Sequence, residues 1–314
     1  MTNKKTKTTY RVRNWKEYNA ALVKRGSLTV WVSDDVIETW NNAARTGKRG
    51  APRTDTDAAM MWMASLQEIY HLTLRSTEGL LASIITLLGV EWECPDHTTL
   101  SRRRRVLDVV LPRRRATAPF HLVVDATGVK VYGDGEWKVR QHGYSKRRTW
   151  RKLHIGADEA TGEIVAAVVS TNDVSDGQVL PELLAQTDEP LTQVSGDGGY
   201  DQRSCYVAID EREARAVIPP QKNARIWQHG NSGAERLARD ENLRAIRKQG
   251  RAAWKRESGY HRRSLAETQM FRMKQIFSAR VSARTFDGQA AQLLVRCAVL
   301  NQMTHLGMPD SYAV

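Results

Sequence analysis

The residues with the clearest chemical potential are three carboxylates far apart in the chain, Asp125, Asp197 and Glu267. Asp125 follows the apolar run 120–124 and Asp197 comes shortly after the run 191–194; each run is typical of a buried strand. The ends of strands are where open α/β sheets commonly carry their sites, although a single acidic residue there can be an ordinary turn former. We therefore treat the three carboxylates as one candidate site.

Glu267 lies in a segment, 260–274, that contains no Gly or Pro and is predicted to be a helix. At about 100° per residue, Tyr260, Arg263 and Lys274 fall within about 40° of Glu267 on the helix surface. Beside this polar arc runs an apolar stripe that can seat the helix on a core, made of Ala266, Met270, Met273 and Phe277. The alternative is a plain amphipathic helix in which Arg263 and Glu267 form a surface pair.

Three carboxylates brought together would repel one another at neutral pH, because their ordinary pKa values lie near 4. A divalent cation relieves that repulsion, and hard oxygen ligands favour Mg²⁺ or Mn²⁺, which also bind phosphate oxygens. Two such ions roughly 3.5–4 Å apart can activate a nucleophile and stabilise the leaving oxygen of a phosphodiester. The chemistry that this combination favours is cutting and joining of a nucleic acid backbone.

The charge balance agrees with such a substrate. The chain has 48 Lys and Arg against 35 Asp and Glu, a net charge of +13 and a pI near 9.8, which favours a polyanionic partner. A basic surface kept for solubility is the alternative. The three cysteines show no metal-binding spacing, and no stretch is long enough to span a bilayer, so we expect a cytoplasmic protein without disulfides, zinc or membrane contact.

The chain divides into two predicted regions. Residues 1–118 are mainly helical, with a basic arm at 1–10, a short strand at 27–32 and a basic loop at 45–53. The third of three successive helices runs through the arginines at 102–105, which we expect to contact DNA in a helix-turn-helix arrangement; a solvated basic helix is the alternative. The arginines concerned are Arg102, Arg103, Arg104 and Arg105.

Residues 119–314 alternate strands and helices, with a hairpin at 151–169, and predict an α/β sheet flanked by helices. A basic insertion at 219–259 separates the last strand from the helix that bears Glu267. Two tryptophans in it, Trp227 and Trp254, are candidates either for core positions or for stacking on an unpaired base.

The complete pattern resembles the bacterial DDE transposases, specifically the insertion-sequence-five family. Tyr260, Arg263, Glu267 and Lys274 match the C-terminal signature Y-x₂-R-x₃-E-x₆-K. Residues 124–132 (VDATGVKVY) are similar to the block around the first aspartate, and residues 197–201 (DGGYD) to the second. Further landmarks are at 14–18, 26–29 and 95–99, so the resemblance covers essentially the whole chain.

The resemblance implies an RNase H-like catalytic core in which Asp125, Asp197 and Glu267 hold two Mg²⁺ or Mn²⁺ ions. It implies cleavage at the terminal inverted repeats of an insertion sequence, followed by attack of the freed 3′-hydroxyl on target DNA. Arg263 and Lys274 would contact DNA phosphates with support from Tyr260, and synapsis of two ends implies a homodimer or higher oligomer, associated with the bacterial nucleoid.

Three other functions stay open at this point. A structure-specific nuclease would use the same fold and triad without strand transfer. A pure DNA-binding protein would rely on the N-terminal helices, and the intact triad argues against it. A glycosidase also uses paired carboxylates, but the basic charge gives it no support.

Overall fold

The computed structural model describes residues 9–32, 34–40, 55–114, 118–132, 149–229 and 237–314. The predicted basic arm up to residue 8 and the basic loop at 45–53 lie outside these ranges. The main sheet is mixed, with the strand order β4-β3-β2-β5-β6 and a short strand β7 that pairs with β2. Its strands are β2 (Phe120–Val131), β3 (Trp150–Asp158), β4 (Ile164–Thr171), β5 (Leu191–Ser195), β6 (Arg215–Val217) and β7 (Arg280–Val281).

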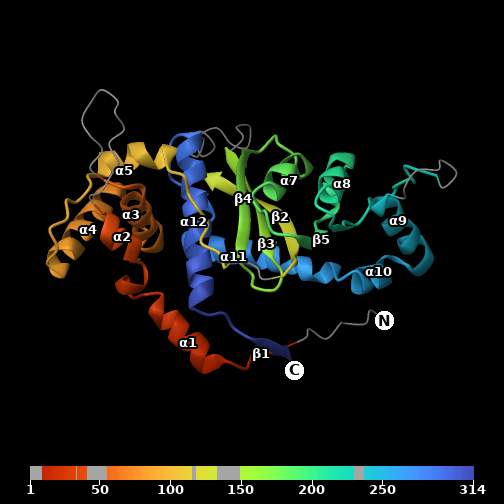
Figure 1. Ribbon diagram of the computed structural model, residues 1–314, viewed down its shortest axis with the longest axis horizontal. Coiled ribbons are helices and arrows are strands. Elements are labelled where there is room, and N and C mark those ends of the chain that lie inside the picture. Colours follow the sequence, from red (N-terminus) through yellow and green to blue (C-terminus); the bar gives the residue numbers. More distant parts are fainter. Residues whose placement is uncertain (1–8, 33, 41–54, 115–117, 133–148, 230–236) are drawn as a thin grey trace, which may run out of the picture.

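Helices cover both faces of this sheet, as the α/β pattern predicts (Figure 1). On one face lie α7 (Asp176–Leu184) and α8 (Arg203–Asp210), and on the other lie α11 (Ser264–Phe277) and α12 (Phe286–Leu306). The alternation of side chains along β2 serves both layers: Leu122 and Val124 pack with α7 and α8, whereas Val123 and Val129 pack with α11 and α12. The predicted apolar stripe of α11 is buried against the sheet.

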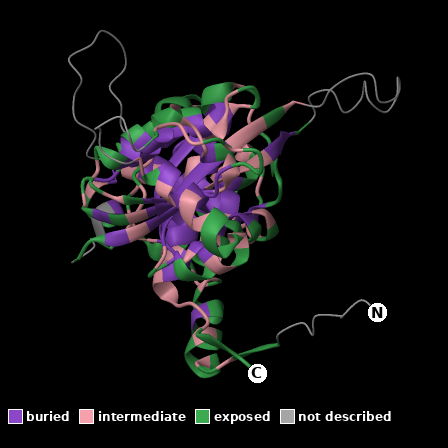
Figure 2. Ribbon diagram, turned by 90° about the vertical axis from the view of Figure 1, so that its right-hand side faces the viewer, coloured by how far each residue is buried: buried purple, intermediate pink, exposed green. Residues whose placement is uncertain are grey.

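The N-terminal region is helical, as expected, and its helices are α1 (Trp15–Lys24), α2 (Asp34–Thr39), α3 (Asp57–Ile69), α4 (Leu74–Leu88) and α5 (His97–Arg103). Thr56, Thr73 and Asp96 cap α3, α4 and α5 through their side chains. The buried residues of α2 to α5 belong to the same hydrophobic cluster as α11 and α12. Figure 2 shows this buried interior concentrated in the body of the molecule.

Two local predictions are wrong or incomplete. Residues 27–32 do not form a strand: Leu28–Val30 is a 3₁₀ turn, because the buried Trp31 folds back and donates its indole N–H to the carbonyl of Arg25. The chain ends also pair with each other, β1 (Tyr10–Val12) with β8 (Ser311–Ala313), a long-range contact that no local pattern announces. Together with α1 this ribbon extends away from the body (Figures 1 and 2).

The basic insertion folds as α9 (Ala238–Gln249) and α10 (Arg251–Glu257), followed by a 3₁₀ turn, Tyr260–Arg263, that leads into α11. The predicted helix at 260–274 therefore begins as a tighter turn and becomes α-helical at Ser264. Among the described residues, no helix is long and apolar enough to cross a membrane.

Candidate active site

The two aspartates are brought together by the register of two parallel strands. Val123 of β2 lies opposite Ser195 of β5, and Asp125 and Asp197 each stand two residues beyond that pair. β5 ends at Ser195, and β7 joins the same edge of β2 only at Lys130. In the described chain, the part of β2 between Val123 and Lys130 therefore pairs with neither β5 nor β7 along this edge. Asp125 lies in this gap, where side chains from α11 can reach it.

Arg263 connects the first aspartate to the glutamate. Its Nη1 donates to Asp125 Oδ2 at 3.0 Å, and its Nη2 contacts the carboxylate of Glu267 one helical turn further on. The guanidinium is largely buried, with 16% of its side chain exposed, and lies 5.7 Å from the ring centroid of the buried Tyr260. The spacing predicts that Arg263 and Glu267 share a helix face, and the structure adds that Arg263 joins Glu267 to Asp125.

Lys274 reaches the same strand two residues along. Its Nζ donates to Thr127 Oγ1 at 2.6 Å, and Thr127 shares a strand face with Asp125 because side chains alternate. The polar arc of α11 thus lies along the gap in β2, with Glu267 near one end and Lys274 about two turns away. Thr127 was not singled out from the sequence, although its place at i+2 from Asp125 would have indicated it.

The electrostatics of Asp125 reflect both burial and its charged neighbours. Burial raises the pKa of Asp125 above its ordinary value, and Arg263 opposes that rise. The charges of Asp197 and Glu267 raise the same pKa further. A buried carboxylate with two further carboxylates near it favours a cation, and in this structure Arg263 is the cation between Asp125 and Glu267.

The carboxylate oxygens of Asp125, Asp197 and Glu267 are ligands of the type that a hard divalent ion prefers, but their positions in this structure differ from those of a metal site. Within the described residues, no three acidic, His or Cys side chains stand close enough to hold a metal ion as placed. The Arg263 guanidinium takes up carboxylate oxygens of Asp125 and Glu267. Asp197 Oδ1 accepts a hydrogen bond from the backbone of Gly199 at 2.8 Å, which fixes its direction. Ligation by all three carboxylates requires Arg263 to turn away.

A second cluster of polar side chains lies on the opposite face of the sheet, and it was not predicted from the sequence. Lys152 on β3 pairs with Asp176 at 2.5 Å, and His154 Nε2 bonds Ser170 at 2.8 Å. Burial lowers the pKa of His154 to about 4, against the opposing charge of Asp176. The alternation Lys152-x-His154 on a strand was the available signal.

Several predicted DNA contacts take other positions. Arg104 is buried and donates to Gln67 at 2.7 Å, and Arg103 pairs with Asp57, so both guanidinium groups are used inside the protein. Consecutive residues on a helix point about 100° apart, so a run of four arginines cannot face one way. Arg102 and Arg105 remain exposed.

The two tryptophans of the insertion pack against other side chains of the protein. Trp254 is buried and its indole N–H donates to Asn242 at 3.3 Å. Trp227 is partly buried, and the guanidinium carbon of Arg239 lies 3.8 Å from its ring centroid. Both rings are therefore in packed positions, as the core alternative expects, and the stacking role stays a prediction.

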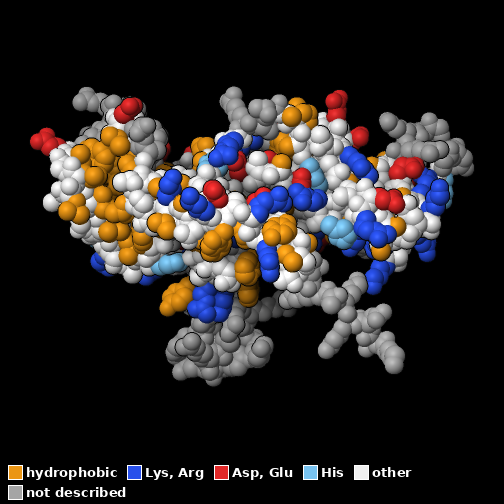
Figure 3. Space-filling view, turned by 90° about the horizontal axis from the view of Figure 1, so that it is seen from below, with side chains coloured by type: hydrophobic (Ala, Val, Ile, Leu, Met, Phe, Trp, Pro, Cys, Tyr) orange, Lys and Arg blue, Asp and Glu red, His pale blue; other side chains and the backbone are white. Residues whose placement is uncertain are grey.

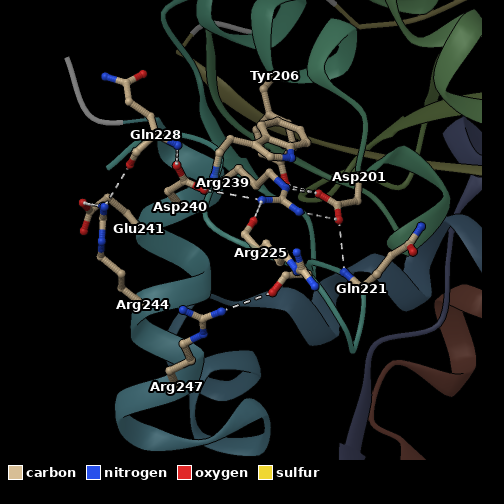
Figure 4. Close-up of polar contacts among 12 residues, drawn as sticks. Asp201, Tyr206, Gln221, Arg225, Gln228, Arg239, Asp240, Glu241, Arg244 and Arg247 are labelled. Carbon is tan, nitrogen blue, oxygen red and sulfur yellow. Dashed lines mark hydrogen bonds and ion pairs between the residues drawn. The ribbon is translucent and has the colours of Figure 1, made fainter. Parts of the chain in front are cut away.

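Arg239 also joins the insertion to the second catalytic block. Its Nε donates to Asp201 at 2.7 Å, and both side chains are almost fully buried (Figure 4). Asp201 in turn accepts from the backbone of Gln221, while the neighbouring Asp240 accepts from the backbone N–H groups of Trp227 and Gln228. Asp201 stands four residues after Asp197, so this network fixes the loop that carries the second carboxylate.

Two family models, each described as "Transposase DDE domain", match residues 23–134 and residues 118–302, the second covering more than half of the chain. Among solved structures, the chain is similar to a piggyBac transposase synaptic complex with hairpin DNA, at 11% identity and a TM-score of 0.37, over 95% of this chain and 76% of that one. A TM-score at that level does not bear on the details of the site.

The chain belongs to the DDE transposase family. Its mixed sheet flanked by helices is an RNase H-like core, and the protein is an enzyme acting on DNA. Members of this family generally use divalent metal ions.

Proposed function

We propose that this transposase binds the terminal inverted repeats of an insertion sequence and catalyses metal-dependent strand cleavage and strand transfer into target DNA. The observation that supports this is the convergence of Asp125 and Asp197 through strand register, with Glu267 joined to Asp125 through Arg263. The basic charge of the chain supports DNA as the partner (Figure 3 shows Lys and Arg spread across one face).

In this proposal Asp125, Asp197 and Glu267 hold Mg²⁺ or Mn²⁺, two ions in the full complex. When bound, the ions supply a nucleophile at neutral pH and stabilise the leaving 3′ oxygen. Arg263 exchanges its carboxylate partners for a DNA phosphate, which it can bind through two parallel N–H groups. Lys274 leaves Thr127 for a neighbouring phosphate, and Tyr260 keeps Arg263 in place through packing. Two DNA ends held together imply a homodimer or a higher oligomer.

The test is Asp197→Asn, with Asp210→Asn on α8 as a matched acidic control. We expect Asp197→Asn to lower the nicking rate on a duplex carrying the element's end by at least about a thousandfold, because metal stabilisation of the transition state supplies several kcal/mol. End binding should persist, and Asp210→Asn should cut normally. Persistent nicking by Asp197→Asn in Mg²⁺ would remove this residue from the site.

The nuclease alternative needs its own experiment. Pre-cut ends with a free 3′-hydroxyl are incubated with supercoiled plasmid, and joined products are sought on a gel. Joining supports a transposase that completes strand transfer, whereas nicking without any joined product favours a hydrolytic nuclease.

A further inference from the structure

A cleft separates the N-terminal helices from the end of the catalytic core. Its volume is about 1400 Å³. One wall comes from α3, α4 and α5, and the other from the end of α11 through β7 to the first turns of α12. Residues that line it include seven arginines and a single carboxylate, that of Glu68.

The floor of this cleft carries a buried excess of positive charge. Glu68 accepts from Arg296 at 2.7 Å and from Gln292 at 2.9 Å, and Arg104 lies 3.9 Å from it. All three charged side chains are at most 8% exposed. Two guanidinium groups thus share one carboxylate, and a buried charge that is incompletely compensated favours an anion at the surface above it.

The walls add five exposed arginines. Arg102 bonds Thr98 and Thr99 of its own helix. The other four are Arg75 and Arg105 on the helical side, and Arg280 and Arg284 on the core side. Within the described chain, none of these four guanidinium groups forms a hydrogen bond or ion pair with another side chain, unlike Arg103 or Arg263. Cations of equal sign that face one another across a cleft repel, so their arrangement is costly until a polyanion enters. Arginine also suits phosphate better than lysine does, because its planar fork binds two oxygens.

The cleft and the candidate active site lie at different points along α11. Phe277 at the end of this helix lines the cleft, and Glu267 is ten residues earlier, which at 1.5 Å per residue is about 15 Å. Lys274 lies between them, at Thr127. A DNA strand advances about 3.4 Å per nucleotide, so this distance corresponds to roughly four to five nucleotides.

We propose that this cleft binds the phosphodiester backbone of duplex DNA, gripping it between the two arginine-bearing walls. The predicted spacing from the cleaved bond, roughly four to five nucleotides, rests on the proposed function; the phosphate binding itself does not. A small anion could meet the floor but not both walls at once. The bound DNA is either the transposon end or the target, and the chemistry of the contact is the same.

The test is the double variant Arg280→Gln/Arg284→Gln, made in the full chain. Binding to a 30-base-pair duplex is measured by fluorescence anisotropy across a salt series without divalent metal. Two lost phosphate contacts should reduce the slope of log K against log salt by about 1.8, since each contributes about 0.9. The matched control is Arg215→Gln, an exposed arginine of β6 that is remote from the cleft.

Two probes distinguish the sources of DNA: a duplex carrying the element's end and one of unrelated sequence. A loss on the end duplex alone supports the proposal and assigns the cleft to the end. Equal loss on both supports a sequence-independent contact. A second double variant on the opposite wall, Arg75→Gln/Arg105→Gln, should give a similar loss. Slopes and affinities equal to those of wild type or Arg215→Gln, in variants that melt normally, would overturn the proposal.

A phosphate-ethylation interference experiment locates the contact. In the wild type we expect interference roughly four to five nucleotides from the cut, and in the Arg280→Gln/Arg284→Gln variant that signal should vanish. Because both assays measure binding without metal, they hold even if strand transfer fails in the tests above. An interference signal unchanged by the substitutions would contradict the assignment.

Discussion

At the scale of single residues, Arg263 is the group that pairs with two carboxylates of the candidate site in this structure. Its guanidinium contacts Asp125 and Glu267, where a metal ion would compete for the same oxygens. The spacing of the signature predicted that Arg263 and Glu267 would share a face. It did not predict that the arginine would also bind Asp125, 138 residues away, because that contact depends on how α11 packs across β2.

We therefore expect Arg263→Gln to bind divalent metal more tightly than the wild type when DNA is absent. Removing the competing cation leaves the carboxylates to attract the ion, while the nicking rate falls because a phosphate contact is lost. Terbium luminescence or Mn²⁺ titration of the free protein measures the affinity. Arg262→Gln, whose partner Glu159 lies outside the triad, is the neighbouring control. Equal or weaker metal binding by Arg263→Gln would contradict the competition.

Buried and exposed arginines could not be separated from the sequence. In the run 102–105 the structure directs Arg103 and Arg104 inward and leaves Arg102 and Arg105 outside. A buried arginine needs a partner, and the partners, Asp57 and Gln67, come from α3 about 40 residues earlier. Local composition carries no information on such pairings.

At the scale of elements, the insertion is tied to the catalytic block by the buried pair Arg239–Asp201. The sequence indicated a basic insertion but not this link, since Asp201 lies in a loop and Arg239 in a basic helix. The strand at 191–194 and the hairpin at 151–169 lie close to their predicted positions, because apolar runs that pack on both faces have few alternatives. The first strand was predicted to end at 124 but continues to Val131, so Asp125 lies inside β2 rather than after its end. The gap in the edge of β2 required knowledge of where β7 joins it.

Breaking that pair should destabilise the fold strongly. Arg239→Gln leaves Asp201 buried without its cation, and we expect the free energy of unfolding to fall by about 3–5 kcal/mol. Chemical denaturation measures it. The control is Arg244→Gln, which removes an exposed pair with Glu241 and should cost at most about 1 kcal/mol. Equal effects of the two substitutions would show that the buried pair is not what holds the insertion.

The strand pair β3–β4 provides a pH test through His154, which is buried against Ser170. Its pKa falls to about 4 in the fold, whereas an unfolded histidine titrates near 6.5. The folded state therefore prefers neutral His154, and this contribution is complete above about pH 6.5 and is lost as the pH falls towards 4. We expect the wild type to lose more stability between pH 7 and pH 5 than His154→Gln does. Identical pH profiles by chemical denaturation would contradict the burial of a neutral imidazole.

At the scale of the whole molecule, the N-terminal helices and the catalytic sheet share a hydrophobic cluster that joins α3 and α4 to α11 and α12. The division at residues 118 and 119 and the DNA-binding role of the first region stay predictions. The net charge of +13 indicated a polyanionic partner from composition alone. The surface that we propose for that partner is the cleft between the two regions, which composition alone does not indicate.

The central claim is that three carboxylates distant in sequence converge on a shared divalent ion. The most direct measurement is iron-mediated affinity cleavage of the protein: Fe²⁺ replaces Mg²⁺ in the DNA-bound protein, ascorbate and peroxide generate radicals at the site, and the cut positions are mapped. We predict cuts close to Asp125, Asp197 and Glu267, all suppressed by excess Mg²⁺ and absent in Asp197→Asn. Cuts confined to one of these segments, or located elsewhere and insensitive to Mg²⁺, would contradict the account.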